Sequence, residues 1–83
     1  MNKVAAVKPL SNYELLLTFS NHEVRRFDVK PYLDKGIFTE LKDETYFQQV
    51  SLCFDSIAWK NGEDFSPETL YLRSVFVQMQ AVA

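Results

Sequence analysis

The sequence predicts a small α+β domain, with an antiparallel sheet of about five strands and two or three short helices. Short runs of alternating apolar and polar residues occupy the first thirty positions and return near residue 51. Between them lie short segments that open on proline or aspartate, as helices do. With 83 residues, the chain is long enough for one hydrophobic core, so residues 1–83 are predicted to form a single domain.

The first three strands are predicted at Val4–Leu10, Tyr13–Phe19 and Val24–Val29. Ser11-Asn12 and Ser20-Asn21-His22 carry the polar residues that favour the two intervening turns. Because consecutive strands usually pair, we expect an antiparallel meander.

The middle of the chain is predicted to cover this sheet. Pro31 opens a helical turn that Gly36 closes, and Asp43 caps a second short helix. The apolar residues expected to cover one end or face of the sheet are Ile37, Phe38 and Leu41.

A second hairpin and a helix start follow. Ser51–Phe54 and Ile57–Trp59 are predicted strands, joined by a turn at Asp55-Ser56. Asn61-Gly62 suits the positive φ angles of a tight turn. Ser66-Pro67-Glu68 then combines a hydroxyl cap, a proline in the first helical position and an acid in the first turn.

The C-terminal segment, residues 72–83, has few charges for a free tail. Its alternating residues favour a strand, but a helix near Met79 is equally compatible with the sequence. The segment either returns to the sheet within the chain or adds to the sheet edge of another chain. The predicted partner-contact residues are Val75, Phe76, Val77 and Met79, with Phe76 and Met79 as the apolar anchors.

Charge and cysteine usage limit the functional classes. The formal charge of −2 gives no general attraction to nucleic acid or anionic membranes. Cys53 is the single cysteine, which excludes an internal disulfide and suits a reducing cytoplasm. The N-terminus lacks the apolar core of a signal peptide, and no apolar run approaches the ~20 residues of a membrane span. We therefore expect a cytoplasmic domain without membrane contact.

The order of these elements resembles the bacterial family known as domain of unknown function 2442. Its pattern covers about residues 4–71, which leaves 72–83 as a C-terminal extension. The matching residues are Val7–Leu10, Leu15–Phe19, Phe27-Asp28, Pro31, Gly36–Phe47, Trp59, Asn61-Gly62, Asp64, Pro67 and Leu70-Tyr71. Two turn positions depart from the pattern: Lys60 replaces the usual proline and His22 the usual glycine.

The resemblance implies a small α+β fold and brings no enzymatic activity with it. Family members stand beside partner genes such as domain of unknown function 4160, in arrangements that suggest toxin–antitoxin pairs, and a few look fused to helix-turn-helix domains. It therefore implies an uncharacterised non-enzymatic interaction module, the accessory or antitoxin-like partner of a small toxin-like protein. The expected partner is a protein or a second copy of the chain.

No residues form a recognisable catalytic or cofactor set. His22 is the single histidine and is expected in an exposed turn, and Cys53 is expected to be buried or half-buried. The acid pairs Asp43-Glu44 and Glu63-Asp64 have structural explanations, with Asp43 as a helix cap and Asp64 accepting backbone amides in a turn. We predict no enzyme, no metal and no cofactor.

The alternative function is that of a nucleic-acid-associated transcriptional regulator that uses a mildly basic end of the sheet. The basic residues of this end are Lys3, Lys8, Arg25, Arg26 and Lys30. A strand directs Arg25 and Arg26 to opposite faces, and one of them is expected to pair with Asp28 or Glu14. Trp59 and Tyr71 could line a ligand groove. The core is the favoured place for both, with Trp59 on the helix that starts at Ser66.

Overall fold

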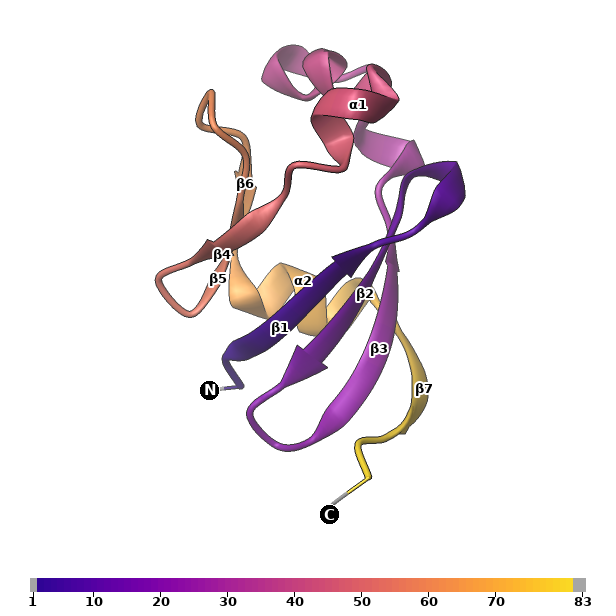
Figure 1. Cartoon of the computed structure of the whole chain (residues 1–83), viewed down its shortest axis with the longest axis vertical. Helices are drawn as coiled ribbons and strands as arrows, with labels where there is room; N and C mark the ends of the chain where they lie inside the picture. The colour runs from indigo at the N-terminus through magenta and orange to yellow at the C-terminus, as the bar shows by residue number, and fades with distance from the viewer. Residues whose placement is uncertain (1, 82–83) are drawn as a thin grey trace.

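The computed structural model describes residues 2–81, which form two antiparallel sheets with helices around them (Figure 1). The four-stranded sheet, called sheet A, has the strand order β1-β2-β3-β7, and the three-stranded sheet B has the order β4-β5-β6. The α+β prediction is confirmed, although the strands divide between two sheets instead of forming one. Three of the predicted strands precede the helical segment and two follow it. This segment leads the chain away from sheet A before β4 begins.

The predicted meander is confirmed as β1 (Val4–Pro9), β2 (Glu14–Phe19) and β3 (Glu23–Asp28). A short 3₁₀ turn, η1 (Ser11–Tyr13), joins the first two strands. Alternate residues of β2 are fully buried, whereas their neighbours are half-buried. One face of sheet A therefore carries the core, and the other carries a mixed surface.

The segment between the sheets consists of η2 (Lys30–Tyr32), η3 (Gly36–Lys42) and α1 (Glu44–Phe47). Asp43 caps α1 as predicted, because its side chain accepts hydrogen bonds from the amides of the two residues after Glu44. Gly36 was predicted to close the first helical turn, but it begins η3, with a φ of 51° that glycine adopts readily.

The apolar residues of this segment contribute unequally to the core. Leu41 is fully buried and Phe38 is half-buried, as expected for residues that cover the sheet. Ile37 is 60% exposed, so its predicted covering role is wrong. It lies next to Gly36 in the first turn of η3, outside the buried face that Leu41 occupies.

Sheet B comprises β4 (Ser51–Cys53), β5 (Ser56–Ala58) and β6 (Asp64–Phe65). The predicted hairpin is present, but its turn lies one residue earlier, at Phe54 and Asp55, which have φ angles of 42° and 57°. Cys53 pairs with Ser56 across the hairpin, so only the two residues between them can form the turn. The Asn61-Gly62 turn is confirmed, with Gly62 at a φ of 101°.

The predicted helix start is confirmed as the beginning of α2 (Pro67–Arg73). The Ser66 hydroxyl accepts the amide of Thr69, and Pro67 occupies the first turn. Leu70 is the fully buried residue of the helix. Figure 1 shows α2 behind sheet A, on the face that carries the core.

Trp59 belongs to the core, as predicted, but its packing differs from the prediction. Its indole N–H donates to the carbonyl of Phe47 at 2.9 Å, and its ring lies 5.8 Å from the Phe47 ring and 6.3 Å from the Phe65 ring. Trp59 therefore connects sheet B to α1 through these contacts.

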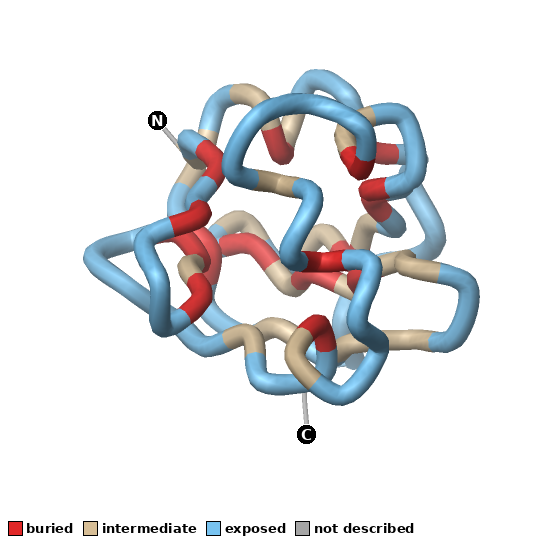
Figure 2. The backbone as a smooth tube through the Cα atoms, turned by 90° about the horizontal axis from the view of Figure 1, so that it is seen from above, coloured by how far each residue is buried: buried red, intermediate tan, exposed pale blue. Residues whose placement is uncertain are grey.

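The core lies between sheet A, sheet B and the helices, and Figure 2 shows the buried parts of the trace facing a shared interior. Aromatic side chains dominate it, with Phe65 stacked on Phe38 and in edge contact with Phe27. Tyr13 meets Phe47 in a further edge contact. Such pairs each add about 0.5–1.5 kcal/mol beyond the burial of their apolar area.

The C-terminal segment returns to sheet A as β7 (Val75–Met79), antiparallel to β3. The choice between strand and helix is thus settled as a strand for these residues, and Val82 and Ala83 lie outside the described residues. Within residues 2–81, no helix has the length and apolar character needed to cross a membrane.

Candidate functional site

The free edge of sheet A is formed by β7, which pairs with β3 on one side and with no strand of residues 2–81 on the other. Its four predicted contact residues are all exposed: Val75 by 59%, Phe76 by 49%, Val77 by 42% and Met79 by 55%. No ionisable side chain occurs from Ser74 to Ala81. A sheet edge with these properties is a template for pairing with another strand.

The opposite edge of sheet A, β1, carries several features that oppose strand addition. Lys8 and Pro9 lie in the strand, and its register shifts between Val4 and Ala6. The β4–β5 hairpin lies beside it, where the amide of Val4 donates to the carbonyl of Asp55 at 2.9 Å (Figure 1). Proline, lysine, bulges and covering segments are the usual protection of sheet edges. On β7 the structure has one of these features, a register shift between its pairs to Val24 and Arg25.

A polar cluster on the α2 side of sheet A holds β7 and α2 in place. The Arg25 guanidinium donates to the Ser74 hydroxyl at 2.7 Å, to the Ser74 carbonyl at 2.9 Å and to Glu23 at 2.7 Å. It also lies 4.5 Å from the centre of the Tyr71 ring, whose hydroxyl donates to Glu23 at 2.5 Å. Ser74 is the residue between α2 and β7, so Arg25 fixes the position at which the edge strand begins.

The carboxylate of Glu23 is held in its charged form by this cluster. The hydrogen bond from Tyr71 lowers the pKa of Glu23, and hydrogen bonds from Arg25 and Asn21 act in the same direction. Together they outweigh burial, which raises it, so the pKa of Glu23 lies below the ordinary glutamate value. The cluster therefore keeps a negative charge at neutral pH, compensated by Arg25.

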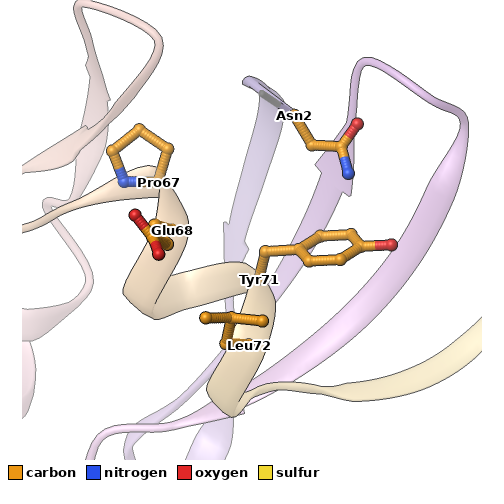
Figure 3. Close-up of a pocket in the computed structure, with 5 residues that line it drawn as sticks. All are labelled: Asn2, Pro67, Glu68, Tyr71 and Leu72. Atoms are coloured by element: carbon orange, nitrogen blue, oxygen red, sulfur yellow. The ribbon is translucent and has the colours of Figure 1, made fainter.

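A shallow pocket of about 320 Å³ lies between the start of β1 and α2 (Figure 3). Its lining residues are Asn2, Pro67, Glu68, Tyr71 and Leu72. Tyr71, predicted to be in the core, is half-buried: it packs edge-on against Phe19 at 5.1 Å and also forms one wall of this pocket. The lining offers an aromatic ring, a carboxylate and an amide, without a nucleophile beside a base.

The five basic residues of the alternative prediction do not form one surface. Arg25 lies on the α2 side of sheet A, whereas the register of β1, β2 and β3 places Lys8 and Arg26 on the other face. Four of the five have acidic partners within 4 Å: Lys3 with Asp55, Arg25 with Glu23, Arg26 with Glu14, and Lys30 with Glu14 and Asp28. The predicted pairing of one arginine with Glu14 is confirmed for Arg26.

A buried carboxylate, that of Glu63, lies in the β5–β6 turn. Glu63 is 1% exposed and accepts a hydrogen bond from the Tyr46 hydroxyl at 2.6 Å, which in turn accepts the amide of Asn61. Burial raises the pKa of Glu63, but the hydrogen bonds from the Tyr46 hydroxyl and from its own amide hold it below the usual value. Burial and the bond to Glu63 raise the pKa of Tyr46, so its hydroxyl stays protonated.

Asp64 does not have its predicted structural role among residues 2–81, and the buried hydrogen bond of this turn belongs to Glu63, which accepts the Tyr46 hydroxyl. Asp64 is exposed, and no hydrogen bond to its carboxylate occurs within residues 2–81. Because Phe65 points into the core, its strand neighbour Asp64 must point outward. His22 lies in the β2–β3 turn, at the opposite end of the molecule from the β5–β6 turn that holds Glu63 (Figure 1).

Cys53 is exposed, so its predicted burial is wrong. All three residues of β4 are exposed, because this strand forms one edge of the small sheet B. In the described part of the chain, no three His, Cys, Asp or Glu side chains lie together in a way that could hold a metal ion.

The tip of the β4–β5 hairpin is a feature that the sequence analysis missed. Phe54 is 95% exposed and Leu52 49% exposed, so the tip carries a second apolar surface. A positive φ is uncommon for a bulky residue, and a phenylalanine inside a two-residue turn has no sequence signature.

The fold and these surfaces define a class: a small α+β domain with one protected and one open sheet edge. A family model described as Protein of unknown function (DUF2442) matches residues 4–76, and the chain belongs to this family. The match extends past residue 71 and includes α2 and the first two residues of β7. No curated protein and no solved structure matches the chain.

Proposed function

We propose that this protein is a non-enzymatic interaction module that binds a protein partner at the β7 edge. The observation that supports this most is the contrast between the exposed, uncharged strand β7 and the protected strand β1. The free Cys53 thiol fits a role in the reducing cytoplasm.

The partner binds by strand addition. Its backbone pairs with the free amides and carbonyls of β7, which supplies affinity, while side-chain contacts supply specificity. Phe76 pairs with Arg25, and Met79 pairs with Glu23, so both lie on the face of sheet A that α2 covers. Val75 pairs with Arg26 on the other face. A partner strand thus meets apolar side chains on both faces of the sheet.

The Arg25 cluster prepares this edge for binding. Its two hydrogen bonds to Ser74 fix the residue directly before the edge strand in the absence of a partner. Ordering a flexible strand would otherwise reduce the binding free energy, at about 1–2 kcal/mol per ordered residue. A fixed β7 avoids this loss.

The partner class is a small toxin-like protein, for which this chain is the accessory or antitoxin-like partner. The support is what the family resemblance implies, a position beside partner genes in arrangements that suggest toxin–antitoxin pairs. An antitoxin acts by occupying a surface of its toxin, and a preformed sheet edge suits that task.

The experiment combines capture with reconstitution. The tagged chain is expressed in its host, co-purifying small proteins are identified, and the identified protein is tested for growth arrest alone and with this chain. Val77→Lys places a charge at the edge and should abolish both capture and rescue, whereas Ile37→Lys, at an exposed site in η3, should preserve both. Capture that is equal for both variants would refute the β7 edge as the binding site.

The alternative, a nucleic-acid-associated regulator, is less supported because acids accompany four of the five predicted cations. A titration of the protein with duplex and single-stranded DNA at increasing salt distinguishes the two. A nucleic-acid interface loses affinity steeply with salt, by about 0.9 logarithmic units for each phosphate contact per unit of log salt on duplex DNA. The interaction module should bind neither DNA form, even at low salt.

A further inference from the structure

We infer that the β7 edge pairs with the β7 edge of a second copy of this chain, forming a dimer with a continuous eight-stranded sheet. This inference rests on the proposed function of β7: the second copy occupies the edge in the absence of the foreign partner, and the two compete for it. The strand order of the dimer is β1-β2-β3-β7 in one copy, followed by β7-β3-β2-β1 in the other.

The two different edges of sheet A favour a closed dimer. When two copies join at β7, both ends of the combined sheet are β1, which carries Lys8, Pro9 and the hairpin contact to Asp55. The assembly therefore stops at two chains. A foreign strand on β7 would instead leave its own free edge at the end of the sheet, so self-pairing is the arrangement that this chain alone can complete.

The charges of the edge also fit a second copy. In a twofold contact each surface meets itself, so any charge near the axis would face a like charge. From Ser74 to Ala81 there is no ionisable residue, and the nearest cation below the strand, Arg25, is already neutralised by Glu23. Residues 74–81 therefore bring no unpaired charge into the interface.

The apolar side chains supply the association free energy. Val75, Phe76, Val77 and Met79 are each between 42% and 59% exposed, so each copy has apolar area available for burial. Burial stabilises at about 25 cal/mol per Å². Leu72, 69% exposed at the end of α2, adds to the apolar surface near the start of the strand.

The first test measures mass against concentration. Sedimentation equilibrium of the full chain from about 1 to about 100 μM, the range of a micromolar dissociation constant, should show a transition from 9.7 kDa to twice that mass. Val77→Lys should raise the dissociation constant at least about tenfold. Ile37→Lys, the matched control, should leave it unchanged.

A second test remains informative if Val77→Lys fails to fold. Single cysteines are placed at Phe76, Val77 or Gln78 in a Cys53→Ser background. Opposed residues of an antiparallel pair have Cα atoms about 4.5–5.5 Å apart, within disulfide range, so a residue near the twofold axis should cross-link to its copy. At least one position should oxidise to a disulfide dimer faster than Ile37→Cys in the same background.

The outcomes separate this inference from the proposed function. A chain that stays monomeric at about 100 μM, or a dimer unaffected by Val77→Lys together with no cross-linking in β7, overturns the self-pairing. In either case, capture of a partner that Val77→Lys abolishes would leave the interaction function standing. Failure of capture with a β7-dependent dimer would overturn the foreign partner instead.

Discussion

The two edges of sheet A differ in how they meet solvent, although both are strands of five or six residues. At β1 the protection comes from local sequence, Lys8 and Pro9, and from the contact with the β4–β5 hairpin. At β7 the side chains are apolar and exposed, while a half-buried polar cluster on the α2 side of sheet A holds the start of the strand. A chain of this size can therefore specify one open edge by protecting the other.

The largest loss of stability is predicted for a substitution in the centre of sheet A, between its two edges. Leu17 is fully buried in β2, opposite Val7 of β1 and Arg25 of β3. Leu17→Ala removes buried methyl groups and leaves a cavity, so the free energy of unfolding should fall by about 2–5 kcal/mol. Urea denaturation measures this loss.

The matched control for Leu17→Ala is Phe76→Ala on β7. Phe76 is 49% exposed in the isolated chain, so at low protein concentration the loss should be below about 1 kcal/mol. Equal losses for the two variants would mean that β7 is part of the core and not a free surface.

A double substitution that removes Lys8 and Pro9 tests whether these residues keep the β1 edge from pairing. Lys8→Val combined with Pro9→Val supplies a β-branched strand and restores an amide donor at the edge. With both edges open, the chain should form assemblies larger than a dimer, seen as a rise in light scattering with concentration. Adding Val77→Lys to this double variant closes the β7 edge again and should limit the assemblies.

The outcome against this prediction is a double variant that keeps the mass of the parent chain at every concentration. The β4–β5 hairpin would then be sufficient protection for β1 by itself.

Sequence reasoning succeeded where local rules decide the structure. The Asp43 and Ser66 caps, the Asn61-Gly62 turn and the alternation of β2 depend on nearest neighbours, and each is confirmed. It failed where distant contacts decide, as for Cys53, whose exposure depends on β4 being an edge.

The candidate site shows the same division. The apolar residues of β7 were predicted from their alternation, but the cluster of Arg25, Glu23 and Tyr71 joins positions about fifty residues apart. No single-sequence pattern reports such a contact. The burial of Glu63 is a similar case, because its Tyr46 partner lies on a different element.

Acid should loosen β7 before it loosens β1. The pKa of Glu23 is lower in the folded chain than in the unfolded chain, mainly because of the hydrogen bond from Tyr71. The stabilisation that this carboxylate gives to the fold is therefore present above about pH 4.3, the ordinary pKa of glutamate. This stabilisation is lost as the pH falls through the folded value. Hydrogen-exchange protection factors of β7 should therefore decrease more than those of β1 as the pH falls below the ordinary glutamate pKa.

Tyr71→Phe is the control for the acid effect. It removes the hydroxyl that lowers the pKa of Glu23 most while keeping the ring against Phe19. The variant should show weaker protection of β7 at neutral pH and a smaller change with pH. Parallel losses in β7 and β1 would assign the acid response to another carboxylate, and Glu63, also lowered in pKa, would be the group to test next.

The smallest change in stability is predicted for the β4–β5 hairpin, which contacts β1. Phe54 is 95% exposed at a φ of 42°, so its ring contributes no packing in the isolated chain while its backbone is strained. Phe54→Asn places a residue that tolerates this conformation and should raise the free energy of unfolding by about 0.5–1 kcal/mol. Thermal denaturation at low protein concentration measures the gain.

A gain would show that the phenylalanine is retained at a cost in stability, as expected for a residue that contacts a partner, whereas a loss would show that the ring packs within the chain. If Phe54→Asn also weakens capture of a partner, the hairpin tip and β7 are both contact surfaces, and the protected edge of sheet A has a function besides protection.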